Sequence, residues 1–173
     1  MSEETTMHIR PERPADIASI RAVNLTAFET STEADLVDAL REQAHPIVSL
    51  VADDVGAIVG HILFSPVTLR AHPELQIMGL APMAVVPAKQ RQGIGSALVR
   101  EGLEQCRRLG FGAVVVLGHA EYYPRFGFTP ASRFGLRCEY DVPDEVFMVL
   151  ELDADVLRGK SGTIQYHPAF GSA

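Results

Sequence analysis

Hydrophobic residues along the chain follow two different periods, and each period predicts a different kind of element. Spacings of three and four residues predict amphipathic helices at 14–28, at 31–43 and from about Gly93 to Leu109. Alternating or continuous apolar runs predict strands, and these lie near residues 7–13, 46–54, 56–70, 75–87, 111–118, 128–130 and 145–152. Strands and helices are therefore interleaved along the 173 residues, as in a domain that mixes both.

The helix expected from Gly93 to Leu109 has one apolar half, which must pack on a sheet. Gly102 lies in the middle of that half, where a missing side chain permits close approach, and Gly110 should end the helix in a left-handed conformation. The run "FGAVVVLG" at 111–118 is typical of a strand buried on both faces. Strand, helix and strand then form a right-handed crossover between parallel strands.

Prolines and glycines mark three further features. Pro82 lies inside the strand at 75–87 and removes a ladder hydrogen bond, so a bulge or a frayed pairing is expected there. The segment "HAEYYPRFGF" predicts a short helix that Pro124 confines to its first turn and that ends at Gly127. The tail from Asp153 has no clear period, and we expect it to lie along the body or to mediate a subunit contact.

Composition and charge narrow the class of protein. Hydrophobic residues make up 47% of the chain and charged residues 21%, which is ordinary for one globular domain. The net charge of −7 argues against general nucleic-acid binding. The two cysteines form no disulfide framework, which favours a cytoplasmic location. The polar, acidic start is unlike a signal peptide, and no apolar run approaches the ~20 residues of a membrane span.

The turn "QRQGIG" at 90–95 is the first candidate for chemistry. Gly93 and Gly95 let the backbone approach a ligand, and the first N–H groups of the following helix have no partner within it. With the helix dipole and the charges of Lys89 and Arg91, the turn predicts a pyrophosphate site; the simpler alternative is an ordinary glycine loop. It is not a Walker loop, and Leu98 stands where the dinucleotide fingerprint needs its third glycine.

Other catalytic patterns are weaker. The six histidines show no ligand spacing, so no metal site is expected, and no GxSxG elbow occurs. Cys106 lies on the apolar half of its helix and is expected to be a core thiol. The aromatic cluster in "EYYPRFGF" is either a plug over the end of the sheet or the source of a tyrosine hydroxyl that protonates a leaving group.

Two segments together resemble the GNAT N-acetyltransferase superfamily. In "LAPMAVVPAKQRQGIGSALVREGLEQCRRLGF", residues Gln90, Gly93 and Gly95 match the family pattern [QR]-x-x-G-x-[GA]. In "VVVLGHAEYYPRFGF", the pattern Y-x-x-x-G-F is matched by Tyr123, Gly127 and Phe128. The resemblance covers roughly residues 7–152 and points to a subgroup of acetyltransferases whose substrate is undefined.

The resemblance implies an α/β (α+β) fold, with a mixed, mostly antiparallel central sheet splayed between two parallel strands and helices on both faces. It implies one domain at 1–153, followed by the tail at 154–173. Acetyl-CoA is the implied co-substrate, without a metal. Its pantetheine would pair with the backbone of Met83, Ala84 and Val85, and its pyrophosphate would lie on the amides of Arg91, Gln92, Gly93, Ile94, Gly95 and Ser96.

The implied function is transfer of the acetyl group to a primary amine by direct attack in a ternary complex. Tyr123 would protonate the departing CoA thiolate, and a backbone N–H near Ala84 or Val85 would stabilise the oxyanion. His119 could cap the short helix, contact CoA or act as a base. Val116 stands where many members carry asparagine, and no general base is identifiable, so a water chain could serve.

Two other functions stay open at this point: a non-catalytic acyl-CoA-binding module on the same fold, and an unrelated nucleotide-phosphate enzyme. The acceptor would be a small-molecule amine or a protein amine, bound over the loops at 25–35 and 131–144. Glu29, Glu33 and Asp35 in the first loop suit a cationic amine, or are simply solvated charges. No nucleic-acid or membrane partner is expected, and a homodimer could form.

Overall fold

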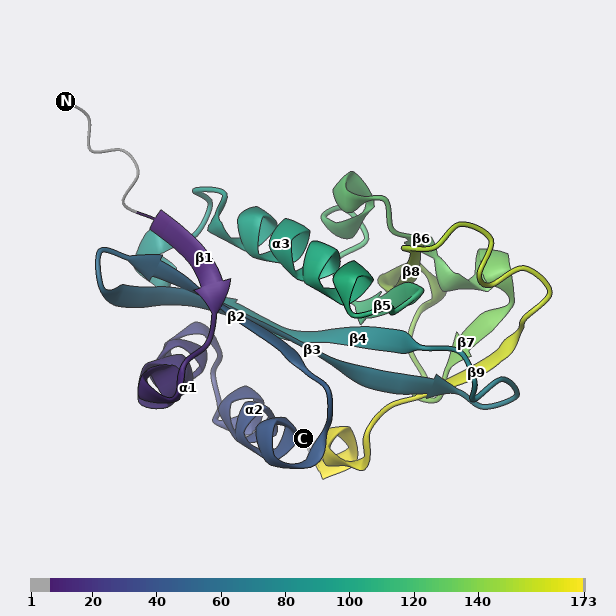
Figure 1. The fold of residues 1–173 in the computed structure, drawn as a ribbon, viewed down its shortest axis with the longest axis horizontal. Coiled ribbons are helices and arrows are strands. Elements are labelled where there is room, and N and C mark those ends of the chain that lie inside the picture. The colour runs from purple at the N-terminus through teal and green to yellow at the C-terminus, as the bar shows by residue number, and fades with distance from the viewer. Residues whose placement is uncertain (1–6, 173) are drawn as a thin grey trace.

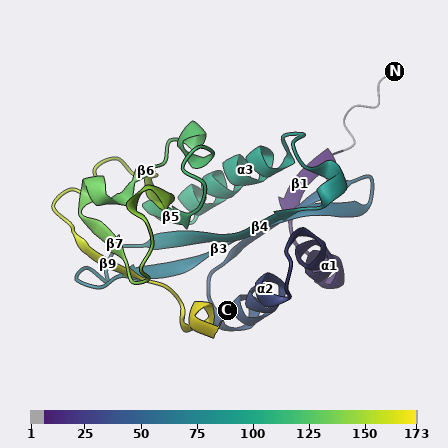
Figure 2. The same ribbon diagram turned by 180° about the vertical axis from the view of Figure 1, so that it is seen from behind.

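The computed structural model describes residues 7–172, and its fold is a twisted mixed sheet covered by helices on both faces. Residues 1–6 of the predicted domain and Ala173 of the predicted tail lie outside this range. One face carries α3 (Ile94–Arg108), and the other carries α1 (Ile17–Ala27) and α2 (Thr32–Gln43), as Figure 1 and the reverse view in Figure 2 show.

The sheet runs in the order β1-β2-β3-β4-β5-β8-β6, and β9 joins β3 to β7 beside this path. The strands are β1 (Met7–Pro11), β2 (Val48–Asp54), β3 (Ala57–Leu69), β4 (Ile77–Val85), β5 (Ala113–Leu117), β6 (Thr129–Pro130), β7 (Leu136–Cys138), β8 (Phe147–Glu151) and β9 (Gly162–Gln165). Only β4–β5 and β7–β9 pair in parallel among the pairings of residues 7–172. The predicted mixed, mostly antiparallel sheet is therefore confirmed.

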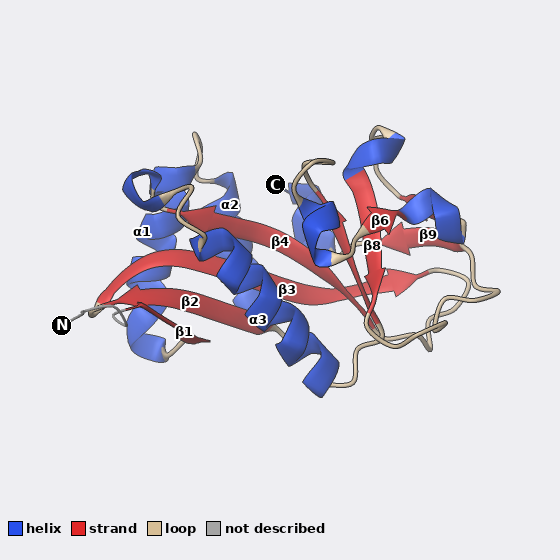
Figure 3. Ribbon diagram, turned by 90° about the horizontal axis from the view of Figure 1, so that it is seen from above, coloured by secondary structure: helices blue, strands red, loops and turns tan. Residues whose placement is uncertain are grey.

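The irregularity predicted at Pro82 is present. Ile62 of β3 faces Met83 and Phe64 faces Leu80, so Leu63 alone lies opposite both Ala81 and Pro82. This is a bulge on β4, and beyond it β4 no longer pairs with β5: their parallel ladder runs only from Ile77 to Leu80. Figure 3 shows β4 and β8 running in diverging directions.

The predicted crossover is also present, because α3 connects the parallel strands β4 and β5. Residues Ala113–Val116 of β5 are fully buried, as expected for a strand covered on both faces. Gly93 and Leu109 flank α3 as its caps, and Gly110 has the left-handed φ of 92° that was predicted. Leu98, Val99 and Cys106 are fully buried against the sheet.

The opposite face of the sheet holds a separate apolar cluster. Ile20 of α1 and Leu40 of α2 pack there against Val51 and Leu63 of β2 and β3. Both helices therefore bury one stripe, as their periodicity indicates.

Some sequence expectations were incomplete. The first helix is preceded by a 3-10 turn at Pro14–Asp16, so α1 begins at Ile17. The short helix near residue 123 is a 3-10 helix, Tyr123–Phe126, which ends at Gly127 as predicted. The sequence pattern did not predict β7 or β9, because strands of three and four residues carry too few positions to show a period.

The segment after Asp153 shares an apolar core with the rest of the chain. Leu157, Ile164 and Tyr166 are buried, and β9 pairs with Thr68 and Leu69 of β3. The division into a domain at 1–153 and a tail at 154–173 stays a prediction. Within residues 7–172, no helix has both the length and the apolar composition needed to cross a bilayer.

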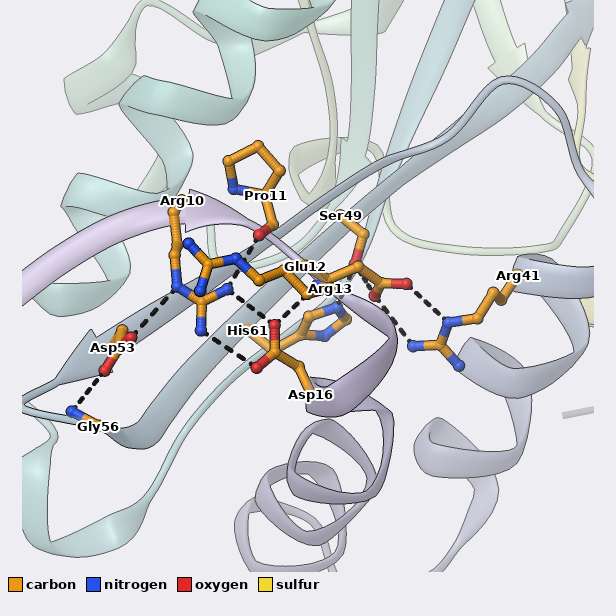
Figure 4. A network of polar contacts seen from close by, with 10 residues as sticks. All are labelled: Arg10, Pro11, Glu12, Arg13, Asp16, Arg41, Ser49, Asp53, Gly56 and His61. Atoms are coloured by element: carbon orange, nitrogen blue, oxygen red, sulfur yellow. Dashed lines mark hydrogen bonds and ion pairs between the residues drawn. The ribbon is translucent and has the colours of Figure 1, made fainter.

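A buried polar network lies on the face covered by α1 and α2 (Figure 4). Ser49 Oγ is 2.9 Å from His61 Nε2 and also donates to Glu12 Oε1. Arg41 donates two hydrogen bonds to Glu12, at 2.8 and 3.0 Å. His61 is fully buried, and this burial lowers its pKa to about 4. The folded protein therefore holds this imidazole neutral.

Because His61 is buried, we predict that the free energy of unfolding decreases as the pH is lowered. The unfolded chain protonates this group near its ordinary pKa of 6.5, whereas the folded chain does so near 4. Between these values the unfolded state binds more protons, so the free energy of unfolding should drop by about 3 kcal/mol from pH 6.5 to pH 4. Urea denaturation at a series of pH values measures the drop.

The variant His61→Gln isolates this contribution, because it keeps a polar side chain that does not titrate. Hydrogen bonds from Arg41 and Ser49 lower the pKa of Glu12 despite burial, which acts to raise it. Glu12 therefore adds a loss of stability only below its ordinary range, and the window from pH 6.5 to 5 belongs to the histidine. An equal slope in the wild type and in His61→Gln over that window would contradict the assignment.

The second prediction concerns the close approach at Gly102. A β-carbon there would lie 2.6 Å from Phe64 Cζ, inside contact distance. We expect Gly102→Ala to lower the free energy of unfolding, because overpacking costs about 1–3 kcal/mol and outweighs the ~1 kcal/mol gain in helix propensity. Urea denaturation measures the change. Gly171→Ala is the matched control, since its added methyl meets no atom within 4 Å; an equal effect in both variants would refute the packing explanation.

Candidate active site

The turn that leads into α3 has the geometry of an anion site. Gly93 caps the helix with a left-handed φ of 88°, and Arg91 before it has a φ of 66°. Ala97 is the first residue whose N–H bonds back within the helix, to Gly93 O at 3.0 Å. The N–H groups of residues 94–96 therefore lack helical partners, and the helix dipole adds partial positive charge at the same place.

A cavity of about 420 Å³ lies over this turn. Its lining combines the predicted backbone positions with basic side chains: Val85, Lys89, Gln90, Arg91, Gly93, Gly95, Ser96, Tyr122 and Arg125. The site residues predicted at the turn are thus brought together, with two exceptions. Gln92 and Ile94 are not in the lining: the side chain of Ile94 is buried in the core, and Gln92 Nε2 donates to Ala88 O at 3.4 Å.

Sequence reasoning missed two members of this cavity, Tyr122 and Arg125. The Tyr122 hydroxyl lies 3.1 Å from Ser96 Oγ, and the Arg125 guanidinium stacks 4.4 Å from the centre of the Tyr122 ring. Both come from "YYPRFGF", whose aromatic residues were considered while its arginine was not. Lys89, expected to add positive charge, is paired with Asp54 at 3.4 Å.

Gly95 has a structural role that the sequence did not predict. A β-carbon at this position would lie 3.2 Å from the Tyr122 hydroxyl and 3.5 Å from Met83 Cε. Gly93 has no such neighbour within 4 Å. The two glycines of the turn therefore differ: Gly93 supplies the left-handed cap, and Gly95 makes room for the tyrosine.

A second cavity, of about 500 Å³, lies where β4 and β5 separate. It is bounded by the ends of these strands, by α2 with the loop before it, and by the C-terminal segment. Its lining is mostly apolar: Phe28, Thr32, Glu33, Leu36, Leu80, Ala81, Pro82, Met83, Leu117, Gly118, His119, Tyr123, Tyr140, Tyr166 and Phe170. Three predicted site residues, Met83, His119 and Tyr123, are among them.

Tyr123 lies in this second cavity as a buried side chain that is only 6% exposed. Its ring packs edge-on against Tyr122 and Phe128, with centroids 5.0 and 5.7 Å apart, and a β-carbon at Gly118 would lie 2.9 Å from its Cδ2. No hydrogen bond of its hydroxyl is found within residues 7–172. Burial raises the pKa of Tyr123 to about 12, so the phenol is protonated at neutral pH and can act as a proton donor.

The backbone of β4 between the two cavities is the third predicted feature. Met83, Ala84 and Val85 pair with Ile62, His61 and Gly60 of β3 on one side. On the side toward β5, no strand within the described chain pairs with them, because the parallel ladder has ended at Leu80. Gln90 Nε2 donates to Val85 O at 2.9 Å and occupies part of this edge.

His119 is exposed at the rim of the second cavity. Its backbone carbonyl, 3.1 Å from Tyr122 N, accepts the hydrogen bond that leads into the short helix, and the helix has no side-chain cap. Capping by the imidazole, one of the three roles considered for His119, is therefore wrong. Among residues 7–172, no group of three or more His, Cys, Asp or Glu side chains is placed to hold a metal ion.

Known proteins match this chain over most of its length. It is 41% identical over 165 residues to the uncharacterized N-acetyltransferase YhbS of Escherichia coli K12, covering 95% of this chain and 98% of that protein. It is 44% identical over 144 residues to the uncharacterized N-acetyltransferase YjhQ of the same strain, covering 81% of this chain and 78% of YjhQ.

Two solved structures share the fold. The crystal structure of E. coli YhbS in complex with CoA superposes with a TM-score of 0.92 at 37% identity, covering 99% of this chain and 95% of that one. A GNAT family acetyltransferase from Brucella melitensis in complex with acetyl-CoA superposes with a TM-score of 0.79 at 40% identity, covering 95% and 97%. The family model described as "Acetyltransferase (GNAT) family" matches residues 16–128, which include the turn, α3 and Tyr123. The chain belongs to the GNAT family of acetyltransferases.

Proposed function

We propose that the protein transfers the acetyl group of acetyl-CoA to a primary amine by direct attack in a ternary complex. The observation that carries this proposal is the pair of cavities on either side of the unpaired edge of β4. One lies over the helix N-terminus and is lined by Tyr122, and the other is lined by Tyr123. An extended ligand could run from the anion site along the free edge of β4 into the apolar cavity. CoA has the shape and the charge distribution for this path.

The residues present fit the co-substrate at both ends. The backbone of Arg91, Gln92, Gly93, Ile94, Gly95 and Ser96 would hold the pyrophosphate, with Arg125 close by. The free edge of Met83, Ala84 and Val85 would pair with the pantetheine arm, and His119 lies at the rim where the arm would end. The relatives crystallised with CoA and acetyl-CoA, at 37% and 40% identity, support the same choice of ligand.

The reaction forms a C–N bond and breaks the C–S bond of the thioester. The amine lone pair attacks the carbonyl carbon, the sulfur leaves with the bonding electrons, and one amine proton is released to water. The Tyr123 hydroxyl, which is protonated at neutral pH, would protonate the sulfur, and the resulting phenolate would regain a proton from the water that took up the amine proton. The products are an amide and free CoA. A cytoplasmic location and a homodimer remain predictions from the sequence.

Binding of acetyl-CoA should stabilise the fold. At about 100 times its dissociation constant the expected gain is ~2.7 kcal/mol, measured as an upward shift of the thermal midpoint. ATP and NAD at the same concentration should shift it much less, since neither carries a pantetheine arm to pair with the edge of β4. Equal shifts with all three ligands would contradict the CoA assignment.

A matched pair of glycine variants locates the phosphate within the same assay. Gly93→Val adds a branched side chain at the turn, while Gly56→Val does so in the β2–β3 hairpin. Both glycines have φ near 90° and no atom within 4 Å of an added β-carbon, so the backbone strain is similar. Only Gly93→Val should weaken the stabilisation by acetyl-CoA, and an unchanged stabilisation would place the phosphate elsewhere.

The third experiment tests the proton donor. Tyr123→Phe removes a hydroxyl that makes no hydrogen bond within the described residues, so folding and CoA affinity should be retained. Turnover should fall by roughly 10²–10⁴ if proton transfer limits the rate, measured as thiol release from acetyl-CoA with a panel of amines. Tyr122→Phe, which loses the bond to Ser96, should keep most of its turnover. Full turnover in Tyr123→Phe with a loss in Tyr122→Phe would identify Tyr122 as the acid. If the wild type and both variants release no thiol, a non-catalytic CoA-binding module is favoured.

A further inference from the structure

The cavity beside Tyr123 also contains features that the CoA site does not use. Its far wall is built from α2, the loop before it and the C-terminal segment, which are remote from the CoA turn in sequence. The titratable residues in the described lining are Glu33, His119 and three tyrosines. No lysine or arginine is among the described lining residues. The lining therefore offers negative charge to a ligand and no fixed positive charge.

Glu33 differs from its acidic neighbours on α2. Asp35 and Asp38 both form ion pairs with Arg21, at 3.0 and 2.8 Å. Glu33 Oε1, by contrast, is buried and finds no hydrogen-bond partner among residues 7–172. Leaving a buried carboxylate oxygen unpaired costs free energy, so this group is placed as if to receive a donor from a ligand.

Tyr166, another residue of the same lining, carries a second unpaired polar atom. Its side chain is 6% exposed, its hydroxyl is buried, and this hydroxyl has no hydrogen-bond partner in the described part of the chain. Burial raises the pKa of Tyr166, so the hydroxyl is neutral and can donate or accept. Glu139 Oε2 holds the backbone of this residue by accepting its N–H at 2.6 Å. This hydrogen bond fixes the backbone from which the Tyr166 ring extends.

Aromatic rings form the remaining wall. The Tyr166 ring lies 5.8 Å from Tyr140 and 5.1 Å from Phe170, centroid to centroid, and Phe28 lines the same cavity. Gly79 of β4 allows this packing, because a β-carbon there would lie 3.2 Å from Tyr166 Cε2. Ring faces attract ammonium groups as well as apolar surface. A carboxylate among aromatic rings is thus a suitable site for an organic cation.

We propose that the acetyl acceptor is a primary amine with an apolar or aromatic body and no carboxylate, recognised by Glu33 and Tyr166 in this cavity. The inference rests on the proposed function, which it deepens by naming the acceptor class. An amino acid would bring its carboxylate beside the carboxyl group of Glu33, into a lining with no lysine or arginine among the described residues. Free amino acids should therefore be rejected.

The test compares two probes that differ only by a carboxylate, 2-phenylethylamine and L-phenylalanine. Calorimetric titration of each into the full-length protein measures binding without any requirement for turnover. We expect phenylethylamine to bind at least tenfold more tightly. Glu33→Gln should weaken phenylethylamine binding by about tenfold to a hundredfold, the usual worth of a hydrogen bond to a charged group. Tyr166→Phe keeps the ring and should weaken binding to a smaller extent.

Glu42→Gln is the matched control, because it makes the same change of charge on an exposed residue of α2 that does not line the cavity. It should leave phenylethylamine binding unchanged. In thiol-release assays, Glu33→Gln should raise KM for phenylethylamine while the stabilisation by acetyl-CoA stays at its wild-type value.

Equal affinity for the two probes, no binding of phenylethylamine, or unaltered affinity in Glu33→Gln would each overturn the acceptor assignment. None of these outcomes touches the proposed acetyl transfer, provided that acetyl-CoA still stabilises the protein. Loss of that stabilisation in the wild type would refute the proposed function instead.

Discussion

The structure depends on one interruption in the sheet, the separation of β4 from β5 after Leu80. The two strands share a parallel ladder of only four residue pairs, and the bulge at Ala81 and Pro82 comes immediately after it. Pro82 has no N–H to donate, so the ladder could not continue through it unchanged. Both cavities and the unpaired backbone edge between them lie at this point. A regular strand here would close the sheet and leave no site.

The neighbouring residues Tyr122 and Tyr123 line different cavities. Successive residues of a tight helical turn point in different directions, so one ring reaches Ser96 at the start of α3 and the other enters the second cavity. Glycines on the surrounding elements make this possible, since Gly95 leaves space for the Tyr122 hydroxyl and Gly118 for the Tyr123 ring. The conformational freedom of glycine is thus only part of the reason for these residues, and the space beside an aromatic ring is the other part.

The second cavity is assembled from segments far apart in the chain. Glu33 lies on α2, and strands β2 to β5 separate it from Tyr123 in the sequence. Tyr166 lies in the C-terminal segment, directly after β9. Glu33 and Tyr166 each carry a buried oxygen with no hydrogen-bond partner among the described residues. Both of these unpaired polar atoms belong to residues that line one cavity, and this coincidence is the basis of the acceptor proposal.

The sequence by itself determined the features that depend on local periodicity and local backbone chemistry. The apolar half of α3, the buried run of β5, the left-handed cap at Gly110 and the bulge at Pro82 all follow from residues close together in the chain. Four of the six predicted turn residues, Arg91, Gly93, Gly95 and Ser96, also line one cavity, because they are neighbours in a single turn at the start of α3. Tertiary structure alone decided β7 and β9, which are too short to show a pattern and form only by pairing with each other and with β3. It also placed Arg125 over Tyr122 and brought Glu33 and Tyr166 to one cavity. Contacts of this kind join residues with no periodic relation in the sequence, and they exist only once the sheet has brought their elements together.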